Sequence, residues 1–315
     1  MKLFKKSFRI DFMGKRRLAL IFSGALFLTS LGSLIFQGLN FGIDFTGGTV
    51  LEVGYEQPIE LSEVRQDLGG AGFDGAIVQH FGTTRDVLIR LAPGAERNSA
   101  ELSNEVLATL QANGDNSVTM RRVEFVGPKV GEELTEQGGL AMLYALIGIL
   151  IYVSLRFEYR LAIGSVVALV HDVLIVLGIF SLLQFEFDLT VLAALLAVIG
   201  YSLNDTIVVS DRIRENFRKI RKGTAVQVVN TSLNQTLSRT VMTSLTTLLV
   251  LFALFIFGGE AIHSFSMALI MGVLVGTYSS IYIASPTALA LGISKGDLMP
   301  PPAPPKEGAK LDERP

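Results

Sequence analysis

Six apolar runs alternate with polar segments along this chain, and each run is long enough to cross a membrane. A helix that spans the hydrocarbon core needs about 20 mainly apolar residues. The first run is longer than the apolar part of a signal peptide and no small-residue cleavage site follows it, so we interpret it as a retained anchor. We predict a polytopic α-helical membrane protein with six transmembrane helices. The predicted spans are residues 18–39, 139–155, 161–183, 189–210, 239–257 and 264–291.

The long polar segment between the first two spans alternates between strand and helix patterns. The order of the elements is β-α-β-β-α-β, which is typical of the ferredoxin-like fold. The segment therefore predicts a small α+β ferredoxin-like extracytoplasmic domain. One face of its sheet is left open, which suits the binding of a partner or of an extended chain. The predicted strands are 49–55, 76–81, 86–91 and 118–126, and the predicted helices are 62–68 and 99–111.

These patterns divide the chain into five parts. The last part is rich in proline and charge, a composition that predicts disorder. The parts are a cytoplasmic N-terminus (1–17), transmembrane helix 1 (18–39), the extracytoplasmic domain (40–137), the bundle of transmembrane helices 2–6 (138–292) and a disordered cytoplasmic tail (293–315).

Lysine and arginine positions orient the spans. Basic residues precede the first span and follow the fourth, and loops rich in Lys and Arg stay in the cytoplasm. Residues 40–137 carry seven Lys and Arg against sixteen Asp and Glu, a net charge of −9, whereas the remainder of the chain carries +7. Both termini are therefore predicted to be cytoplasmic. The basic residues are Lys2, Lys5, Lys6, Arg9, Lys15, Arg16 and Arg17 before span one, and Arg212, Arg214, Arg218, Lys219, Arg221 and Lys222 after span four.

The composition and the motifs exclude several kinds of binding site. Half of the residues are hydrophobic, the mean hydropathy is +0.48, and the absence of cysteine excludes disulfides, iron–sulfur clusters and thiolate zinc sites. Gly70, Gly72 and Gly75 match a dinucleotide-binding spacing but follow a predicted helix and precede a strand, the reverse of the required context. No phosphate-binding loop motif occurs, and no basic aromatic surface suggests nucleic-acid binding. We predict no cofactor, no metal and no nucleic-acid partner.

The fourth span carries a carboxylate inside its apolar run. Asp205 lies there with Asn204, and Tyr201 precedes Asp205 by one helical turn. An ionisable group in a bilayer costs roughly 3 kcal/mol on insertion scales, so such groups usually face a bundle interior and mark ion paths or proton relays. Asp205, Asn204 and Tyr201 are therefore candidate relay residues.

The third span carries a second carboxylate, Asp172, beside His171. Gly164, Ala168 and Asp172 follow one another at four-residue spacing, which places small residues and the carboxylate on one helix face. Asp172 is therefore expected to face a neighbouring helix and is a further relay candidate. For His171, a structural hydrogen bond and a protonatable relay member are equally good interpretations.

Arg239 opens the fifth predicted span, and Thr243 and Thr247 continue from it on one face. If the helix begins near Thr231, Arg239 lies at about the depth of Asp205 and can compensate its charge. If Arg239 instead reaches back to the interface, it is an anchor. The residues alone favour neither interpretation.

A glycine-rich motif lies just outside the first span. It contains Gly42, Asp44, Phe45, Gly47 and Gly48. Glycines around one aspartate indicate a tight turn with positive φ angles or close backbone packing. We predict a hinge or interface between the first helix and the first strand of the domain, an interpretation at least as good as a ligand site.

These residues lie in motifs that resemble the SecF family, the smaller membrane subunits of the bacterial SecD–SecF preprotein translocation complex. The similar stretches extend over nearly the whole chain and occur in the family's order. They are GIDFTGGT (42–49), VHDV (170–173), GYSLNDTIVVSDRIRENFRKIR (200–221), TLSRTVMTSLTTL (236–248), FGG (257–259) and GTYSSIYIAS (276–285).

The resemblance implies a function. Members of this family, which belongs to the resistance–nodulation–division superfamily, pair with SecD in the bacterial inner membrane. They use the proton-motive force to assist late translocation of unfolded preproteins through the SecYEG channel, and they are not enzymes. The family's proton-conducting aspartate and arginine match Asp205 and Arg239, which favours the functional interpretation of Arg239.

Three other functions compete with this one. A proton-coupled efflux half-transporter of the same superfamily would share the relay but would carry a much larger outer domain. A scaffold that only stabilises SecD would use the polar groups for packing, since hydrogen bonds in membranes contribute about 1 kcal/mol. An intramembrane aspartyl protease would use Asp172 and Asp205 as a dyad, but the Ser-Leu-Asn-Asp context around Asp205 does not fit that class.

Overall fold

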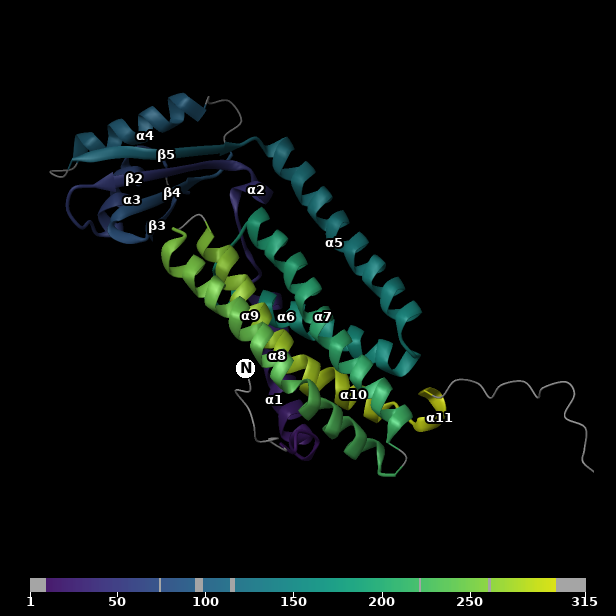
Figure 1. Ribbon diagram of the computed structural model, residues 1–315. Helices are drawn as coiled ribbons and strands as arrows, with labels where there is room; N and C mark the ends of the chain where they lie inside the picture. Colours follow the sequence, from purple (N-terminus) through teal and green to yellow (C-terminus); the bar gives the residue numbers. More distant parts are fainter. Residues whose placement is uncertain are drawn as a thin grey trace, which may run out of the picture.

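A computed structural model describes residues 10–73, 75–93, 99–113, 117–220, 222–259 and 262–298. Six helices in this part of the chain are long and apolar enough to cross a membrane. They form a bundle that carries a small α/β domain at one end, here called the domain end, while α11 lies at the far end (Figure 1). The membrane helices are α1 (Arg16–Phe36), α5 (Pro128–Arg156), α6 (Tyr159–Leu183), α7 (Leu189–Lys219), α8 (Ala225–Phe257) and α9 (His263–Ser279), the last continued by a π-helical segment (Ser280–Ala284) and α10 (Ser285–Ala290).

The α/β domain has the predicted β-α-β-β-α-β order. Its antiparallel sheet has the strand order β3-β4-β2-β5, and helices α3 and α4 contact each other and share one apolar core with the sheet. Together with the six membrane helices, this confirms the predicted fold class. The elements are β2 (Gly48–Tyr55), α3 (Leu61–Gly70), β3 (Ile77–Phe81), β4 (Thr83–Leu91), α4 (Ser99–Asn113) and β5 (Val118–Val126).

Two helices extend beyond the predicted spans at the far end. Helix α7 continues past Ser210 to Lys219, and α8 begins at Ala225 rather than near Arg239. Helix α8 starts there because Thr224 and Gln227 form a capping box. Hydropathy marks only the apolar part of a helix, so the predicted spans leave out the polar ends of this hairpin.

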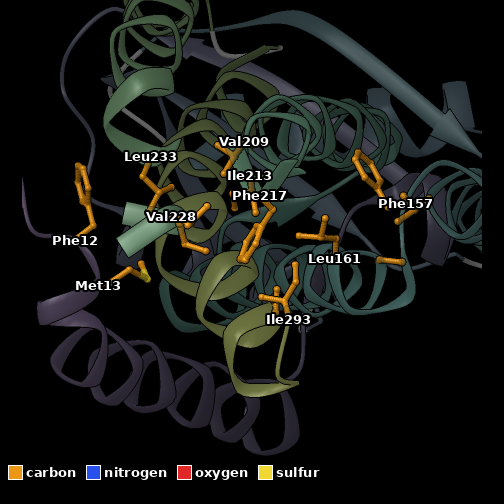
Figure 2. Packing of buried hydrophobic residues seen from close by; sticks show 14 of the residues in the cluster. Phe12, Met13, Phe157, Leu161, Val209, Ile213, Phe217, Val228, Leu233 and Ile293 are labelled. Atoms are coloured by element: carbon orange, nitrogen blue, oxygen red, sulfur yellow. The ribbon is translucent and has the colours of Figure 1, made fainter. Parts of the chain in front are cut away.

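An apolar cluster closes the far end of the bundle. It joins the N-terminal segment, the turn between α5 and α6, the last turns of α7 and the first turns of α8 (Figure 2). Phe12 and Met13 are buried in it although they precede the first span. Their backbone N–H groups donate to the side chain of Asn230 on α8, so the chain before α1 is fastened to the bundle.

Part of the predicted disordered tail is ordered. Lys295–Leu298 form the short helix α11, because Asp297 pairs with Arg160 at the start of α6 and accepts hydrogen bonds from Ser294. The hydrogen bond from Arg160 lowers the pKa of Asp297 to about 2. The rest of the tail, residues 299–315, lies outside the described residues, as do residues 1–9.

Helices α7 and α9 approach closely along a row of small residues. A Cβ atom on Gly272 would lie 2.1 Å from the side chain of Val198, and one on Gly276 would lie 2.9 Å from Ser202. Gly272 and Gly276 belong to a row with Ala268 and Ser280 at four-residue spacing, and α7 is the helix that this row packs against. This close approach lets side chains as short as serine reach across the interface.

The backbone at the start of β2 has a conformation that favours glycine, and a substitution can test this. Gly48 has φ +126°, and a Cβ atom there would lie 2.5 Å from the carbonyl oxygen of Leu91. We expect Gly48→Ala to destabilise the sheet by about 1–3 kcal/mol because strain and steric overlap combine. Hydrogen exchange of β2 and β4 peptides should therefore accelerate. Gly70→Ala is the control, since Gly70 has no neighbouring atom within 4 Å. Equal exchange rates in the two variants would show that the start of β2 does not require glycine at position 48.

Candidate functional site

Asp205 lies in a cage made by three helices. Its side chain is 7% exposed. Thr240 Oγ1 on α8 donates to Oδ1 at 2.7 Å, and Ser280 Oγ on the π-helical segment donates to Oδ2 at 2.6 Å. Each carboxylate oxygen therefore has a hydroxyl donor. Hydrogen bonds to a charged group contribute about 1.5–3 kcal/mol each, which offsets much of the cost of placing a carboxylate in the apolar layer.

A second hydroxyl layer lies one helical turn closer to the domain end. Tyr201 donates to Ser244 at 3.1 Å, and Ser244 Oγ lies 2.7 Å from Thr277 Oγ1. Tyr201 is four residues before Asp205 on α7, and Ser244 is four residues after Thr240 on α8. The two layers thus repeat at the helical period, and the second layer lies on the domain side of Asp205.

Arg239 and Asn204 lie outside this cage. Arg239 precedes Thr240, so it stands at the depth of Asp205, and its positive charge acts on that carboxylate. Its side chain is nevertheless exposed, as is that of Asn204. Asn204, a candidate relay residue in the sequence, therefore does not share a face with Asp205, because consecutive residues of a helix point about 100° apart. The surface of the chain thus carries an amide and a guanidinium within its apolar belt.

Asp172 forms a second buried carboxylate site. It is fully buried and accepts hydrogen bonds from Ser202 on α7 at 2.5 Å and from Ser279 on α9 at 2.7 Å. His171 Nδ1 lies 2.9 Å from its other oxygen. Asp172 therefore faces neighbouring helices, as its spacing with Gly164 and Ala168 suggested. It sits in a cage of its own, adjacent to the cage of Asp205.

His171 combines a paired and an unpaired nitrogen. Its Nε2 atom is buried and lacks a hydrogen-bond partner among the described residues. Its ring stacks on Tyr278, with the centroids 6.4 Å apart, and Tyr278 donates to the carbonyl oxygen of Ala19 on α1. The contacts with Asp172 and Tyr278 place the ring of His171 where α6 meets α9 and α1.

The glycine-rich motif connects the domain to two membrane helices. Residues Ile43–Thr46 form a short helix, α2, and Asp44 Oδ2 accepts the backbone N–H of Leu189, the first residue of α7, at 3.0 Å. A Cβ atom on Gly131 of α5 would lie 2.9 Å from the backbone nitrogen of Gly47. The motif therefore bonds to the helix that carries Asp205 and packs tightly against α5.

Beside this motif, two short parallel strands join the domain to the bundle. Strand β1 (Asn40–Phe41) pairs with β6 (Glu186–Phe187), which precedes α7. The rings of Phe41, Phe45 and Phe187 pack together with centroids 5.7–5.8 Å apart. Phe45 thus belongs to an aromatic cluster at the interface that the sequence predicted for it.

An ion pair lies at the same junction. Arg90 of β4 pairs with Glu186 and donates to the carbonyl oxygen of Phe41. A cavity of about 460 Å³ opens beside it, between the open face of the sheet and the domain ends of the membrane helices. Burial raises the pKa of Glu186 above its ordinary value, Arg90 opposes that shift, and Asp188, Asp44 and Glu124 add to it.

Sequence reasoning missed most of the hydrogen-bond donors. A hydroxyl in an apolar helix is a weak signal, because Ser and Thr often bond to their own backbone. Spacing at the helical period was available for Thr240 and Ser244 in α8. No sequence signal indicated which helices would be neighbours. The donors and partners that the structure adds are Thr240, Ser244, Thr277, Ser280, Ser202, Ser279, Arg90 and Glu186.

Comparisons with known proteins agree with this architecture. Residues 106–294 match the family model of the C-terminal region of protein export membrane proteins SecD/SecF, and residues 32–59 match the SecD/SecF GG motif. A protein translocase subunit SecF from Vibrio alginolyticus is 54% identical over all of this chain and 99% of the relative. The chain belongs to the SecF family of protein translocase subunits. Another SecF, from Pseudomonas aeruginosa, is 52% identical over 93% of this chain and 95% of its own length.

Solved structures of SecDF share the fold. The crystal structure of SecDF from Thermus thermophilus, described as a translocon-associated membrane protein, matches with a TM-score of 0.82 and 41% identity over 92% of this chain. A SecDF structure in a super-membrane-facing form matches with a TM-score of 0.68 over the same share. This SecF-family chain spans 39% of the length of those SecDF chains.

Substitution of Arg90 tests whether its ion pair with Glu186 stabilises the junction between the domain and the bundle. In Arg90→Met, Glu186 keeps its acidic neighbours and loses its cation, so we expect its pKa to rise further. A carboxyl whose pKa is raised by folding binds protons more tightly in the folded state, so the junction loses stability as pH rises through that pKa. Protection of the β1 and β6 amides, relative to their intrinsic exchange rates at each pH, should therefore fall at neutral pH by an amount that corresponds to about 1–3 kcal/mol, and should recover in acid.

The matched control is the double variant Arg90→Met with Glu186→Gln. It leaves no uncompensated carboxylate at position 186, so its exchange should not depend on pH in this way. Equal pH dependence in the single and double variants would show that Glu186 is not the group that titrates.

Proposed function

We propose that this chain works with SecD in the bacterial inner membrane and uses the proton-motive force to assist late translocation of unfolded preproteins through the SecYEG channel. The supporting observation is the Asp205 cage, a carboxylate in the apolar layer with two hydroxyl donors and a nearby cation. Such groups inside membranes mark ion paths and proton relays. Both termini are cytoplasmic in this proposal, so the domain end faces outward.

In this proposal a proton reaches Asp205 from the outer side. On the way it passes the hydroxyl layer of Tyr201, Ser244 and Thr277, which lies one helical turn nearer the domain end. Protonation removes the charge that Thr240 and Ser280 stabilise, so it changes which helix arrangement is favoured. Moving one charge across 100 mV is worth about 2.3 kcal/mol, which shifts a two-state equilibrium about fiftyfold.

Exposed polar groups on the membrane helices indicate the face to which the partner binds. Asn204 and Arg239 both lie exposed on the surface within the apolar belt. Lipid hydrocarbon offers such groups no hydrogen bonds, so another protein must cover them. We assign this face to the membrane helices of SecD, whose polar groups would complete the site around Asp205 together with Arg239.

Movement would reach the outer domain through the start of α7. Asp44 bonds to the first residue of α7 and lies in the motif that leads into β2. Gly47 and Gly48 both have positive φ angles there. In this proposal the motif is the hinge about which the outer domain moves while its open face holds an emerging preprotein.

The two buried carboxylates support a non-enzymatic role. An aspartyl protease dyad requires two carboxylates that share a proton. Here the hydrogen bonds found among the described residues connect Asp172 and Asp205 to separate sets of donors. This chain is therefore proposed to act through conformational coupling and not through catalysis.

Translocation into inverted membrane vesicles tests the proposal. The gradient-dependent part of preprotein transport should be lost in Asp205→Asn and in Arg239→Met, because one lacks the titrating group and the other the cation beside it. Transport without a gradient should continue. Each variant is first shown to assemble with SecD.

The matched control is Asp211→Asn on the same helix. Asp211 pairs with Arg156, and both side chains are more than a third exposed, so its loss should leave gradient-dependent transport intact. Normal gradient-dependent transport in both Asp205→Asn and Arg239→Met would contradict the proposal and make this SecF-family chain a scaffold for SecD.

A further inference from the structure

Two consecutive serines bond to the two buried carboxylates. Ser279 Oγ donates to Asp172 on α6 at 2.7 Å, and Ser280 Oγ donates to Asp205 on α7 at 2.6 Å. Both serines are fully buried. A single peptide bond therefore separates the groups that hold the two carboxylates, so a rotation of the chain at this point must disturb both sites together.

The same point is where helix α9 changes its geometry. Residues Ser280–Ala284 form a π-helical turn between α9 and α10. Pro286 follows in the first turn of α10 and has no N–H to donate to the carbonyl four residues earlier, so the regular ladder is broken there. Ser285 Oγ donates to the carbonyl oxygen of Ser280 at 3.2 Å and supports the wider turn. Single π-helical turns are frequently found at functional sites.

The third membrane helix packs directly on this turn. Ala168 of α6 forms a buried cluster with Ile283 and Ala284. A Cβ atom on Gly164 would lie 2.6 Å from the carbonyl oxygen of Ala284. The row of Gly164, Ala168 and Asp172 on α6 therefore lies along the π-helical turn and ends at the buried carboxylate. Any change in the shape of the turn would alter its packing against α6.

We propose that the Ser280–Ala284 turn is a two-state element that couples the protonation of Asp205 to the hydrogen bonding of Asp172. This inference rests on the proposed proton-coupled function and deepens it. Ser279 and Ser280 are its positioning residues, and α6 is the helix that it moves.

The coupling follows from the strength of charged hydrogen bonds. A bond from Ser280 to a charged carboxylate is roughly twice as strong as a bond to a neutral group. When Asp205 is protonated, the bond from Ser280 weakens and the turn can relax toward an α-helix. An α-helical turn contains one residue fewer than a π-helical turn, so Ser279 rotates away from Asp172.

Among the described residues, the charged or titratable groups near the two carboxylates lie on α6, α8 and α9. The titratable neighbour of Asp172 on its own helix is His171, against which Tyr278 of α9 stacks, and the neighbouring groups from α7 and α9 are serine hydroxyls. Helix α1 contributes Ser23, which donates to Tyr278. The charge that acts on Asp205 from α8 is that of Arg239.

Disulfide formation in the SecD–SecF complex can measure the movement, because this chain contains no cysteine. The reporter pair is Ala168→Cys with Ile283→Cys, between α6 and the turn. The control pair is Ser33→Cys with Ser181→Cys, between α1 and α6, where the native oxygens lie 2.8 Å apart. Cross-linking rates are measured in lipid vesicles with cysteine-free SecD, and the control pair corrects for the effect of pH on the thiols.

We expect the ratio of reporter to control rate to change about tenfold between alkaline and acidic pH, which corresponds to about 1.4 kcal/mol. In Asp205→Asn the ratio should lose its pH dependence. In Pro286→Ala, which restores the missing N–H, the ratio should stay near the acidic value at every pH. Ser280→Ala should behave in the same way, because it lacks the donor to Asp205.

A ratio that does not change with pH would overturn the coupling, even if gradient-dependent transport requires Asp205. A pH-dependent ratio that persists unchanged in Asp205→Asn would also overturn it, because another group would then drive the movement. Failure of the proposed function is a different result, namely normal gradient-dependent transport by Asp205→Asn.

Discussion

A carboxylate inside an apolar layer must be supplied with hydrogen bonds by its own protein, and the architecture of this chain depends on how that is done for Asp205. Thr240 and Ser280 have short side chains, so they reach Asp205 only because three helices pack closely. Gly272 and Gly276 permit this approach between α7 and α9. The hydrogen bonding of the buried carboxylate thus depends on the small residues that let the helices pack closely.

Helix α7 connects this site to both ends of the molecule. Its first residue is bonded by Asp44 of the glycine-rich motif, and its last turns lie in the apolar cluster that closes the far end. A change at Asp205 therefore acts on a helix that is held at the junction with the α/β domain. Arg90 and Glu186 join that domain to the bundle a short distance away.

Much of the architecture follows from the sequence by simple rules. Hydropathy gave six spans, and the alternation of polar and apolar residues gave the order of strands and helices in the domain. Asp205 and Asp172 stood out because carboxylates are costly in apolar helices. The roles of Asp205 and Arg239 came from the resemblance to the SecF family and remain predictions until transport is measured.

Other features required the three-dimensional arrangement. Ser279 and Ser280 look alike in the sequence, yet they bond to carboxylates on different helices. Asn204 and Asp205 are adjacent, yet one is exposed and the other is buried. The sequence around Pro286 breaks a helix, but only the packing of Gly164 and Ala168 against the broken turn connects it to a second carboxylate.

The proposed coupling requires that Asp205 exchanges a proton within its cage. Infrared difference spectroscopy of the SecD–SecF complex in lipid, recorded while the pH is changed, tests this directly. We expect a carboxylic acid C=O band that appears on acidification in the wild type and is missing in Asp205→Asn. An unchanged band in Asp205→Asn would contradict the proposed coupling, because the proton would then be bound by another group.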